Sequence, residues 1–542
     1  MTAARAVGAA LAGLGVRHVF GVVGSGNFHV TNALVEAGAR FVAARHEGGA
    51  ATMADAYSRM SGTVAALTVH QGCGLTNAMT GIAEAAKSRT PMLVLAADVT
   101  EKRSNFYVDQ GGLADAVGAI ALRVESADDA VATAARAYHL ARDERRTVVL
   151  NLPLAVQATP AADAGWSERP RPPEPQPDDV GLARLVEALI HAERPVFIAG
   201  RGSRAPGARE ALLELGDACG ALLATSAVAK GLFHGSPWSL DVSGGFASPL
   251  AAQLIRDADL VVGWGCALNM WTTRHGHLIG PDTTVGQVDL DPDALGAQRP
   301  IDFGVVGGVT AAAHAASAAI ATRSGYRSGA VRAAVQERIR WRDVGYDDTS
   351  TSERIDPRTL TIALDDLLPA ERVIGVDSGN FMGYPSMFLS VPDEYGFCFT
   401  QAFQSIGLGL ATAIGAALAR PDRLPIAALG DGGALMSIAE LDTVRRLGLP
   451  MVVIVYNDDA YGAEVHHFGP DGFDLSTVRF PPTDIAAIAR GFGFDAASVT
   501  RVGDLAAAQT WLDGPRDRPL LIDAKVTADR GSWWLEEAFR GH

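Results

Sequence analysis

Two aspartates, Asp431 and Asp458, each follow an apolar run typical of a buried strand, and together they could hold a metal ion. The runs are PIAALG and MVVIVYN, and a helix from about Ser437 to Leu447 is predicted between them. A right-handed crossover brings two such strands together, so both carboxylates reach one sheet edge. Gly432 and Gly433 would let the backbone approach a phosphate at a helix start, and carboxylates beside a phosphate require a cation such as Mg²⁺. We therefore expect a magnesium and phosphate site here.

A third carboxylate, Glu47, stands where another strand gives way to a helix. The run RFVAAR is followed by His46 and Glu47, and then by the small residues GGAA that open a helical pattern. An acid at this place can simply complement the helix dipole. In an apolar surrounding of small residues, however, a carboxyl group is also suited to proton transfer.

These segments together resemble the thiamine diphosphate-dependent enzymes, such as acetolactate synthase, pyruvate decarboxylase and benzoylformate decarboxylase. The resemblance rests on GDG followed by an N-D-D cluster, and on RHEGGAA. It implies thiamine diphosphate and Mg²⁺ as cofactors, with Asp431, Asp458 and the carbonyl of Ala460 as metal ligands. It also implies that Glu47 hydrogen-bonds and activates the cofactor. Asp458 replaces the family's usual asparagine, and its extra negative charge would either tighten the metal or weaken cofactor binding.

The resemblance extends to other cofactor contacts and to assembly. It implies that Ile406 is the apolar wedge that bends the cofactor and that the Gln404 carbonyl accepts its exocyclic amine, while Gly379 and Asn380 contact the diphosphate. In relatives the cofactor lies between the first domain of one subunit and the third domain of another. A homodimer or homotetramer is therefore expected.

Candidate substrate-facing residues point to more than one subfamily. Ser25 and His70 stand where benzoylformate decarboxylase carries an active-site serine and histidine, although a histidine at a strand end can be purely structural. Glu464 matches a substrate-facing glutamate of pyruvate and indolepyruvate decarboxylases, or it is a solvent-facing helix acid. His275 or His277 is a candidate for the second active-site histidine of benzoylformate decarboxylase, or both belong to a solvated surface patch, while His466 and His467 are left without a role.

Two functions follow from the resemblance. The central segment looks most like acetolactate synthases, which favours decarboxylation of a small, pyruvate-like 2-oxo acid with carboligation to an acetolactate or acyloin product. The alternative is a non-oxidative decarboxylase of the benzoylformate type that releases an aldehyde. The stretch 266–269 lacks the FDDR pattern of flavin-dependent synthases, so FAD is expected to be absent.

The elements that must position these residues form three α/β segments. A proline-rich stretch at 157–179 and a polar stretch at 323–356 interrupt the 542 residues. We predict three doubly wound parallel-sheet domains at 1–158 (pyrimidine-binding), 182–325 (central) and 355–542 (diphosphate-binding), because apolar runs alternate with helical patterns in each. The predicted strands are 18–23, 40–45, 65–70, 91–97, 147–152, 195–200, 221–226, 260–265, 285–290, 372–377, 397–402, 425–431, 451–458 and 519–526.

Composition excludes several other classes of protein. Lys+Arg 46 against Asp+Glu 61 gives a net charge of −15, which argues against nucleic-acid binding. No run reaches the roughly 18 apolar residues of a membrane span. The 4 cysteines are widely spaced and form neither a disulfide framework nor a zinc motif, so a cytoplasmic location is expected.

Overall fold

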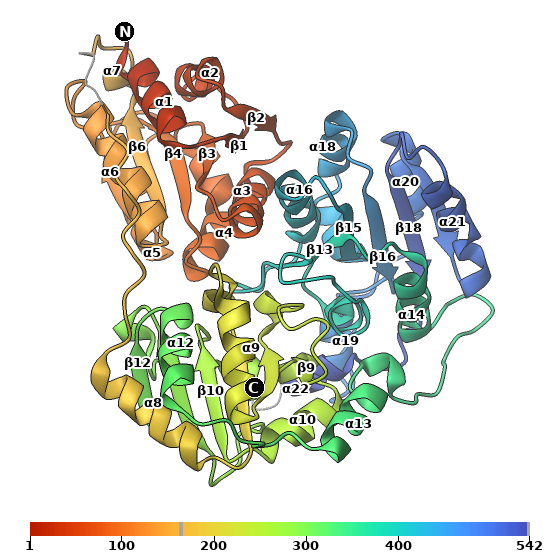
Figure 1. Cartoon of the computed structure of the whole chain (residues 1–542). Helices are drawn as coiled ribbons and strands as arrows, with labels where there is room; N and C mark the ends of the chain where they lie inside the picture. The colour runs from red at the N-terminus through yellow and green to blue at the C-terminus, as the bar shows by residue number, and fades with distance from the viewer. Residues whose placement is uncertain (162–165, 539–542) are drawn as a thin grey trace.

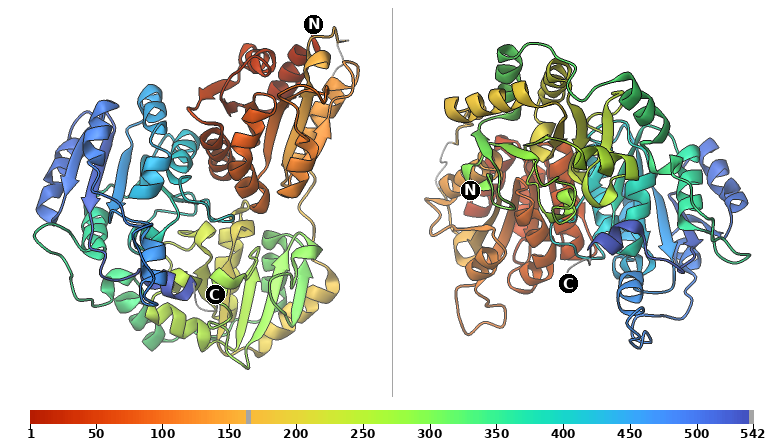
Figure 2. Two further views of the ribbon diagram at one scale, coloured as in Figure 1. Left: turned by 180° about the vertical axis from the view of Figure 1, so that it is seen from behind. Right: turned by 90° about the horizontal axis from the view of Figure 1, so that it is seen from below.

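The computed structural model describes residues 1–161 and 166–538, with side chains described as far as residue 535, and it contains three parallel six-stranded sheets. The sheets lie in separate domains along the chain, and helices cover them (Figure 1). The predicted α/β class and doubly wound arrangement are therefore confirmed. The first domain (red to orange) and the third (blue) lie side by side, and the central domain packs below both (Figures 1 and 2).

The first domain has the strand order β2-β1-β3-β4-β6-β5. Its strands are β1 (His18–Gly21), β2 (Arg40–Ala43), β3 (Ala65–Val69), β4 (Met92–Asp98), β5 (Ile120–Arg123) and β6 (Thr147–Pro153). Its helices are α1 (Ala3–Leu14), α2 (Phe28–Glu36), α3 (Glu47–Ser61), α4 (Cys73–Lys87), α5 (Gln110–Ala116), α6 (Ala130–Asp143) and α7 (Leu154–Gln157).

The central domain has the strand order β12-β11-β10-β7-β8-β9. Strands β7 to β9 follow one another toward one edge of the sheet, and strands β10 to β12 follow one another toward the other edge, as in a dinucleotide-binding fold. Its strands are β7 (Pro195–Ala199), β8 (Leu222–Thr225), β9 (Ser239–Val242), β10 (Leu260–Trp264), β11 (Thr284–Asp289) and β12 (Phe303–Val306). Its helices are α8 (Asp179–His191), α9 (Ala208–Cys219), α10 (Pro249–Arg256), α11 (Met270–Thr273) and α12 (Val309–Ala319), and α13 (Gly329–Arg338) follows it.

The third domain has the order β14-β13-β15-β16-β18-β17, which repeats the order of the first. Its strands are β13 (Arg372–Val376), β14 (Phe397–Phe399), β15 (Leu424–Gly430), β16 (Val452–Asn457), β17 (Asp495–Val499) and β18 (Leu520–Lys525). Its helices are α14 (Pro357–Leu367), α15 (Gly383–Phe388), α16 (Gly409–Ala419), α17 (Asp431–Met436), α18 (Glu440–Leu447), α19 (Gly462–Phe468), α20 (Ile485–Gly491), α21 (Ala506–Asp513) and α22 (Trp533–Ala538). The outer domains are therefore two copies of one topology.

The sequence analysis missed four strands, and all four lie at sheet edges: β5, β9, β12 and β17. An edge strand has a neighbour on one side only, and the residues of β5 and β17 are mostly half-buried. Such strands do not need the continuous valine, isoleucine and leucine runs by which central strands are found. The weak hydrophobic signal is the physical reason for the omission.

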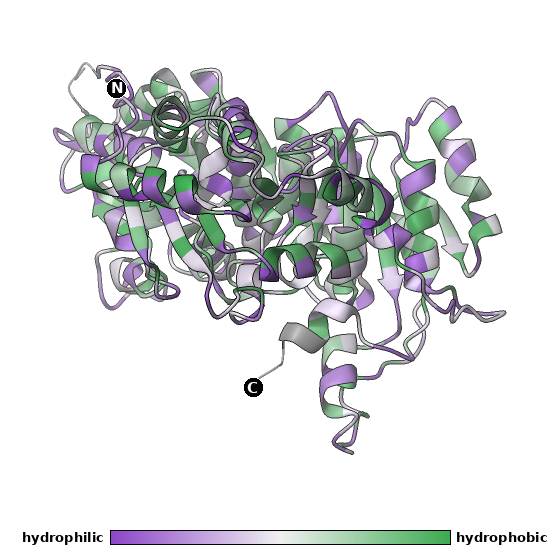
Figure 3. Ribbon diagram, turned by 60° about the horizontal axis from the view of Figure 1, so that its bottom comes forward, coloured by the Kyte–Doolittle hydropathy of each residue, from purple (hydrophilic) through white to green (hydrophobic). Residues whose placement is uncertain are grey.

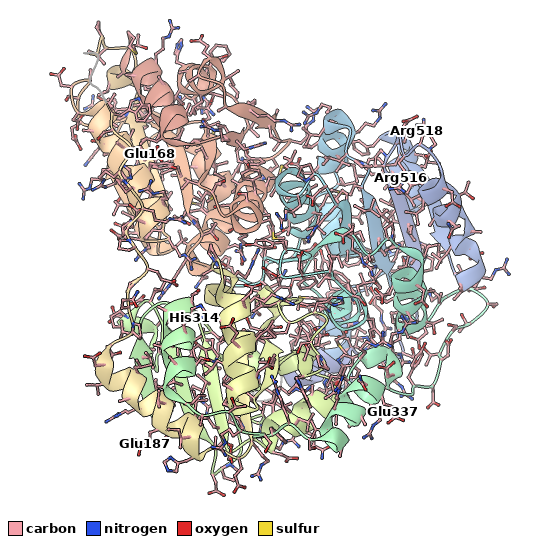
Figure 4. The ribbon with its side chains drawn as sticks, viewed as in Figure 1. Glu168, Glu187, His314, Glu337, Arg516 and Arg518 are labelled. Carbon is pink, nitrogen blue, oxygen red and sulfur yellow. The ribbon has the colours of Figure 1, made fainter. Side chains whose placement is uncertain are left out.

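The first and third domains share one apolar core. The cluster that contains Met53 and Ala54 of α3 also contains Ala413 and Ile414 of α16, all buried. Elsewhere the helices alternate hydrophobic and hydrophilic residues along their length (Figure 3), and charged side chains such as Glu187 and Glu337 project from the periphery (Figure 4). Within the described residues, no helix is long and apolar enough to cross a membrane.

Candidate active site

Asp431 and Asp458 meet at the carboxyl edge of the third sheet, as predicted. Strands β15 and β16 are parallel neighbours, with Gly430 paired with Tyr456 in the register, and the two aspartates follow directly. Their carboxyl groups are close enough to share a hydrogen bond. Burial raises the pKa of Asp431 to about 6, and burial together with the charge of Asp431 raises the pKa of Asp458 to about 8.

The helix predicted from about Ser437 to Leu447 is present as α18, which begins at Glu440, but a separate helix before it was not predicted. Helix α17 begins at Asp431 itself, directly after β15, and α18 follows from Glu440. Gly432 and Gly433, directly after Asp431, obscured α17, because glycine has a low helix propensity. Asp431 is therefore in the first helical turn, where backbone N–H groups and the dipole favour an anion.

The donor set of this edge fits Mg²⁺. Two buried carboxyl groups that repel one another favour a hard cation between them, and the Ala460 backbone lies two positions beyond Asp458 with its residue 9% exposed. Among the described residues no group of three or more His, Cys, Asp or Glu side chains forms a metal cluster. A site of two carboxylates completed by a backbone carbonyl does not require one.

Asp377, which the sequence analysis did not single out, braces two of the predicted cofactor-binding turns. Its carboxylate accepts hydrogen bonds from the backbone N–H groups of Gly407, at 3.0 Å, and Leu408, at 3.2 Å. A Cβ at Gly433 would collide with the Asp377 carboxylate, so the glycine is required for the two turns to approach. Burial raises the pKa of Asp377 to about 6. Its position at the end of the run RVIGVD, before Gly379, is the signal that could have revealed it.

Gly379 and Asn380 lie at the same sheet edge, immediately after β13. Gly379 has φ +129°, a conformation that favours glycine. The Asn380 side-chain oxygen accepts from the Ser532 N–H at 2.8 Å, and its carbonyl accepts from the Ser532 hydroxyl at 2.6 Å and the Trp534 indole at 3.0 Å. The observed partners of Asn380 are thus in the segment near the C-terminus, and its predicted contact with the diphosphate stays a prediction.

Gln404 and Ile406 lie on the turn that connects β14 to α16. Gln404 has φ +61°, which lies in the left-handed region that non-glycine residues rarely adopt. Glu84 of the first domain holds this turn, because its carboxylate accepts from the N–H groups of Ala402, at 3.0 Å, and Phe403, at 2.6 Å. Ile406 is half-buried. No local pattern predicts the Glu84 contact, since 318 positions separate Glu84 from Ala402.

Glu47 is the first residue of α3 and is half-buried. The His46 side chain caps this helix by accepting from the Gly48 N–H at 3.0 Å. Asn77 of α4 donates its side-chain amide to a Glu47 carboxylate oxygen at 3.1 Å. Asn77 is another residue, after Asp377 and Glu84, that sequence reasoning missed, although it lies in the GLTN stretch that follows His70.

Ser25 and His70 come together in the first domain, as their predicted shared role requires. The Ser25 hydroxyl lies 3.4 Å from Nε2 of His70, and His70 Nδ1 lies 3.1 Å from the Gln71 carbonyl. The Phe106 ring meets the His70 ring edge-on at 5.4 Å between centroids. Ser25 is exposed and His70 half-buried, so the pair is accessible to a small molecule.

The remaining candidate residues are spread over two regions. Glu464 is exposed on α19, and Nε2 of His466 on the same helix is buried without a hydrogen-bond partner. His467 packs its ring against Phe468. In the central domain, the His275 and Trp271 rings lie edge to face with their centroids 6.2 Å apart. His277 follows two residues later, in the segment after α11. The role of Glu464, and that of His275 or His277, stay predictions, and His466 and His467 stay without an assigned role.

Three segments of the chain each match a domain of the same enzyme family. Residues 1–121 match the N-terminal TPP binding domain of thiamine pyrophosphate enzymes, residues 182–316 match their central domain, and residues 377–524 match their C-terminal TPP binding domain. TPP denotes thiamine diphosphate.

Several curated proteins are similar over nearly their whole length. A sulfoacetaldehyde acetyltransferase of Rhodobacter capsulatus is 28% identical, covering 97% of this chain and 94% of the relative. A probable 2-ketoarginine decarboxylase of Pseudomonas aeruginosa is 29% identical, with coverage of 91% and 88%. An acetolactate synthase large subunit of Parasynechococcus marenigrum is 26% identical, with coverage of 94% and 85%. With all three domain types matched in order, the chain belongs to the thiamine diphosphate-dependent enzyme family.

Proposed function

We propose that this enzyme uses thiamine diphosphate and Mg²⁺ to decarboxylate a small 2-oxo acid and to join the remaining fragment to a second carbonyl compound. The observation that carries the cofactor part is the buried carboxyl pair Asp431 and Asp458 at the start of α17. Likeness over most of the chain to proteins named acetyltransferase and acetolactate synthase supports the carboligation part.

The third domain would hold the anionic end of the cofactor. Asp431, Asp458 and the Ala460 carbonyl would hold Mg²⁺, which neutralises their mutual repulsion. Gly432 and Gly433 would leave room for a phosphate at the start of α17. Ile406 and the Gln404 carbonyl, which Asp377 and Glu84 brace, would position the two rings.

The first domain would supply the proton-transfer groups. When bound, thiamine diphosphate supplies a nucleophilic carbon that adds to the 2-oxo acid and takes up the electrons released with CO₂. Glu47 would exchange a proton with the pyrimidine ring, and the amide of Asn77 orients its carboxylate. Ser25 and His70 would hold or move protons at the substrate oxygen.

A non-carboligating decarboxylase of the benzoylformate type is the second candidate function. The 3.4 Å contact between Ser25 and His70 favours it, because a hydroxyl and an imidazole that faced the reacting carbon would protonate it and so lead to release of an aldehyde. The likeness to a protein named 2-ketoarginine decarboxylase also supports simple decarboxylation.

The test incubates purified protein with thiamine diphosphate and Mg²⁺. Pyruvate, benzoylformate and 2-ketoarginine are offered alone and with a second carbonyl compound, and sulfoacetaldehyde is offered as a further substrate. CO₂, aldehyde, acyloin and sulfoacetaldehyde consumption are measured. Acyloin or acetolactate supports the first proposal, aldehyde alone supports the second, and the absence of CO₂ from every 2-oxo acid contradicts both.

A further inference from the structure

A buried glutamate of the third domain holds the turn that presents Glu47. Glu440, the first residue of α18, is 3% exposed. Its Oε1 accepts hydrogen bonds from the backbone N–H groups of Arg45, at 3.0 Å, and His46, at 3.1 Å, while Thr443 donates its hydroxyl to Oε2 at 2.6 Å. A carboxylate is buried at acceptable cost only when its oxygens have donors in this way.

The sequence on both sides is adapted to this contact. A Cβ at Gly49 would lie 2.6 Å from Oε1 of Glu440, so the glycine allows the carboxylate to reach the turn. Nearly two helical turns further along α18, Arg446 donates to the Ala43 carbonyl at 2.7 Å. Helix α18 therefore holds the backbone from Ala43 to His46 at both its donor and its acceptor groups.

This backbone decides where Glu47 points. The amides of Arg45 and His46 immediately precede α3, and Glu47 begins it. The angle at which a chain enters a helix fixes the direction of the first helical side chains. Displacement of the turn would therefore displace the Glu47 carboxylate, and a shift of about 1 Å in a catalytic group costs on the order of 100-fold in rate.

We propose that Glu440 is a positioning residue for Glu47. It acts through the amides of Arg45 and His46, without touching the cofactor, and its role rests on the proposed function of Glu47. The same α17–α18 segment carries Asp431 at its start. The segment that would bind the diphosphate of one cofactor would thus also set the geometry of the activating acid that the same chain presents.

The experiment compares Glu440→Ala with Glu440→Gln. Alanine removes both acceptors, whereas glutamine keeps an oxygen for the two amides and an NH₂ group that can donate to Thr443. The matched control is Asp259→Ala in the central domain, because Asp259 likewise accepts from two consecutive amides, those of Glu193 and Arg194, each at 2.8 Å. Three quantities are measured: amide hydrogen exchange across residues 43–49, thiamine diphosphate binding by tryptophan fluorescence, and kcat and KM for the 2-oxo acid.

For Glu440→Ala we expect faster exchange at Arg45 and His46 and a fall in kcat on the order of 100-fold, with KM little changed because Glu47 does not bind the substrate. Glu440→Gln restores slow exchange and most of kcat, and the control alters neither. Unchanged exchange and unchanged kcat in Glu440→Ala overturn the proposal. So does an equal loss in Glu440→Gln, because that would make the charge, and not the position of the turn, the important property.

Two further arms keep the test decisive. If Glu440→Ala does not fold, Glu440→Asp replaces it: the shorter side chain withdraws the acceptor by one methylene, and wild-type exchange and kcat in that variant reject the proposal. Wild-type protein that binds no thiamine diphosphate or releases no CO₂ contradicts the proposed function. The exchange data still report in that case whether Glu440 holds the turn, so the two failures are distinguishable.

Discussion

At the scale of single residues, Glu47 is the most consequential assignment. It is half-buried at the start of α3 and receives a hydrogen bond from Asn77, so its carboxylate has a fixed orientation. We predict that Glu47→Gln keeps thiamine diphosphate bound but lowers kcat by roughly 10²–10⁴-fold, the range for loss of a general acid or base. Steady-state kinetics and fluorescence titration measure the two effects.

The control for this variant is Glu36→Gln, which removes an exposed acid of the same domain that pairs with Arg5. It should leave kcat unchanged, because exposed ion pairs contribute little. Wild-type turnover in Glu47→Gln would remove Glu47 from the mechanism.

The raised pKa values of Asp431 and Asp458 at the third sheet predict that stability and Mg²⁺ affinity depend on pH. The pKa of Asp431 is raised to about 6 and that of Asp458 to about 8, so the folded protein without metal holds protons that the unfolded chain has released. Stability of the metal-free protein therefore falls as the pH rises from about 4 to 8. Mg²⁺ must displace these protons, so its affinity should rise through the upper part of the same range.

Asp458→Asn tests this prediction, because it keeps an oxygen ligand and removes the acid with the most raised pKa. We expect the unfolding midpoint of the metal-free protein at pH 8 to rise by roughly 2–4 °C and the pH dependence of Mg²⁺ affinity to flatten. Calorimetry and metal titration between pH 6 and 8 measure both. A lower midpoint at pH 8 would show that the two carboxylates do not repel in the folded protein.

At the scale of elements, the turn between β14 and α16 depends on Glu84 of α4. Glu84 is fully buried; desolvation alone would raise its pKa, but the Arg59 guanidinium and the amides of Phe403 and Ala402 hold it below the usual value. We predict that Glu84→Ala lowers stability by about 3–5 kcal/mol, because it leaves Arg59 with one fewer buried partner, and weakens thiamine diphosphate binding.

Glu84→Gln is the informative partner of that variant, since it keeps an acceptor for the two amides. Denaturant unfolding should show a smaller loss, and fluorescence titration should show near-normal cofactor binding. If Glu84→Ala binds the cofactor as tightly as the wild type, the turn that carries Gln404 does not need this support.

Elements also show where sequence reasoning succeeds. Every predicted strand is present, because each contains a recognisable apolar run, including β2 and β14, which lie at sheet edges. The edge strands β5, β9, β12 and β17 were missed because their hydrophobic signal is weak. Helix α17 was missed because its glycines lower helix propensity, whereas the fold needs Gly433 for close approach to Asp377.

At the scale of the whole molecule, the resemblance implies that each active site combines Glu47 of one chain with Asp431 of another. Glu47→Gln and Asp431→Asn should each be inactive as purified proteins. Co-expressed with different tags and purified over both, a mixed dimer would have one site with both defects and one intact site. We predict that it regains about half the wild-type activity, as follows from two-fold symmetry.

Absence of any recovery in the mixed dimer would place both residues in a site within one chain. The necessary control is a doubly tagged wild-type dimer, which shows that the tags leave activity unchanged. Light scattering of the same samples distinguishes a dimer from a tetramer.

The sequence alone determined the class of the sheets, their central strands and the meeting of Asp431 with Asp458, because these depend on local hydrophobic period and on the handedness of one crossover. Ser25 and His70 were singled out by the resemblance to benzoylformate decarboxylase, and the tertiary structure placed them 3.4 Å apart. The tertiary structure decided the contacts between domains: Glu84 with the Phe403 turn, and Glu440 with the Arg45 turn. Those pairs lie more than 300 positions apart, and no local pattern encodes which buried carboxylate will find which backbone amides when two domains pack.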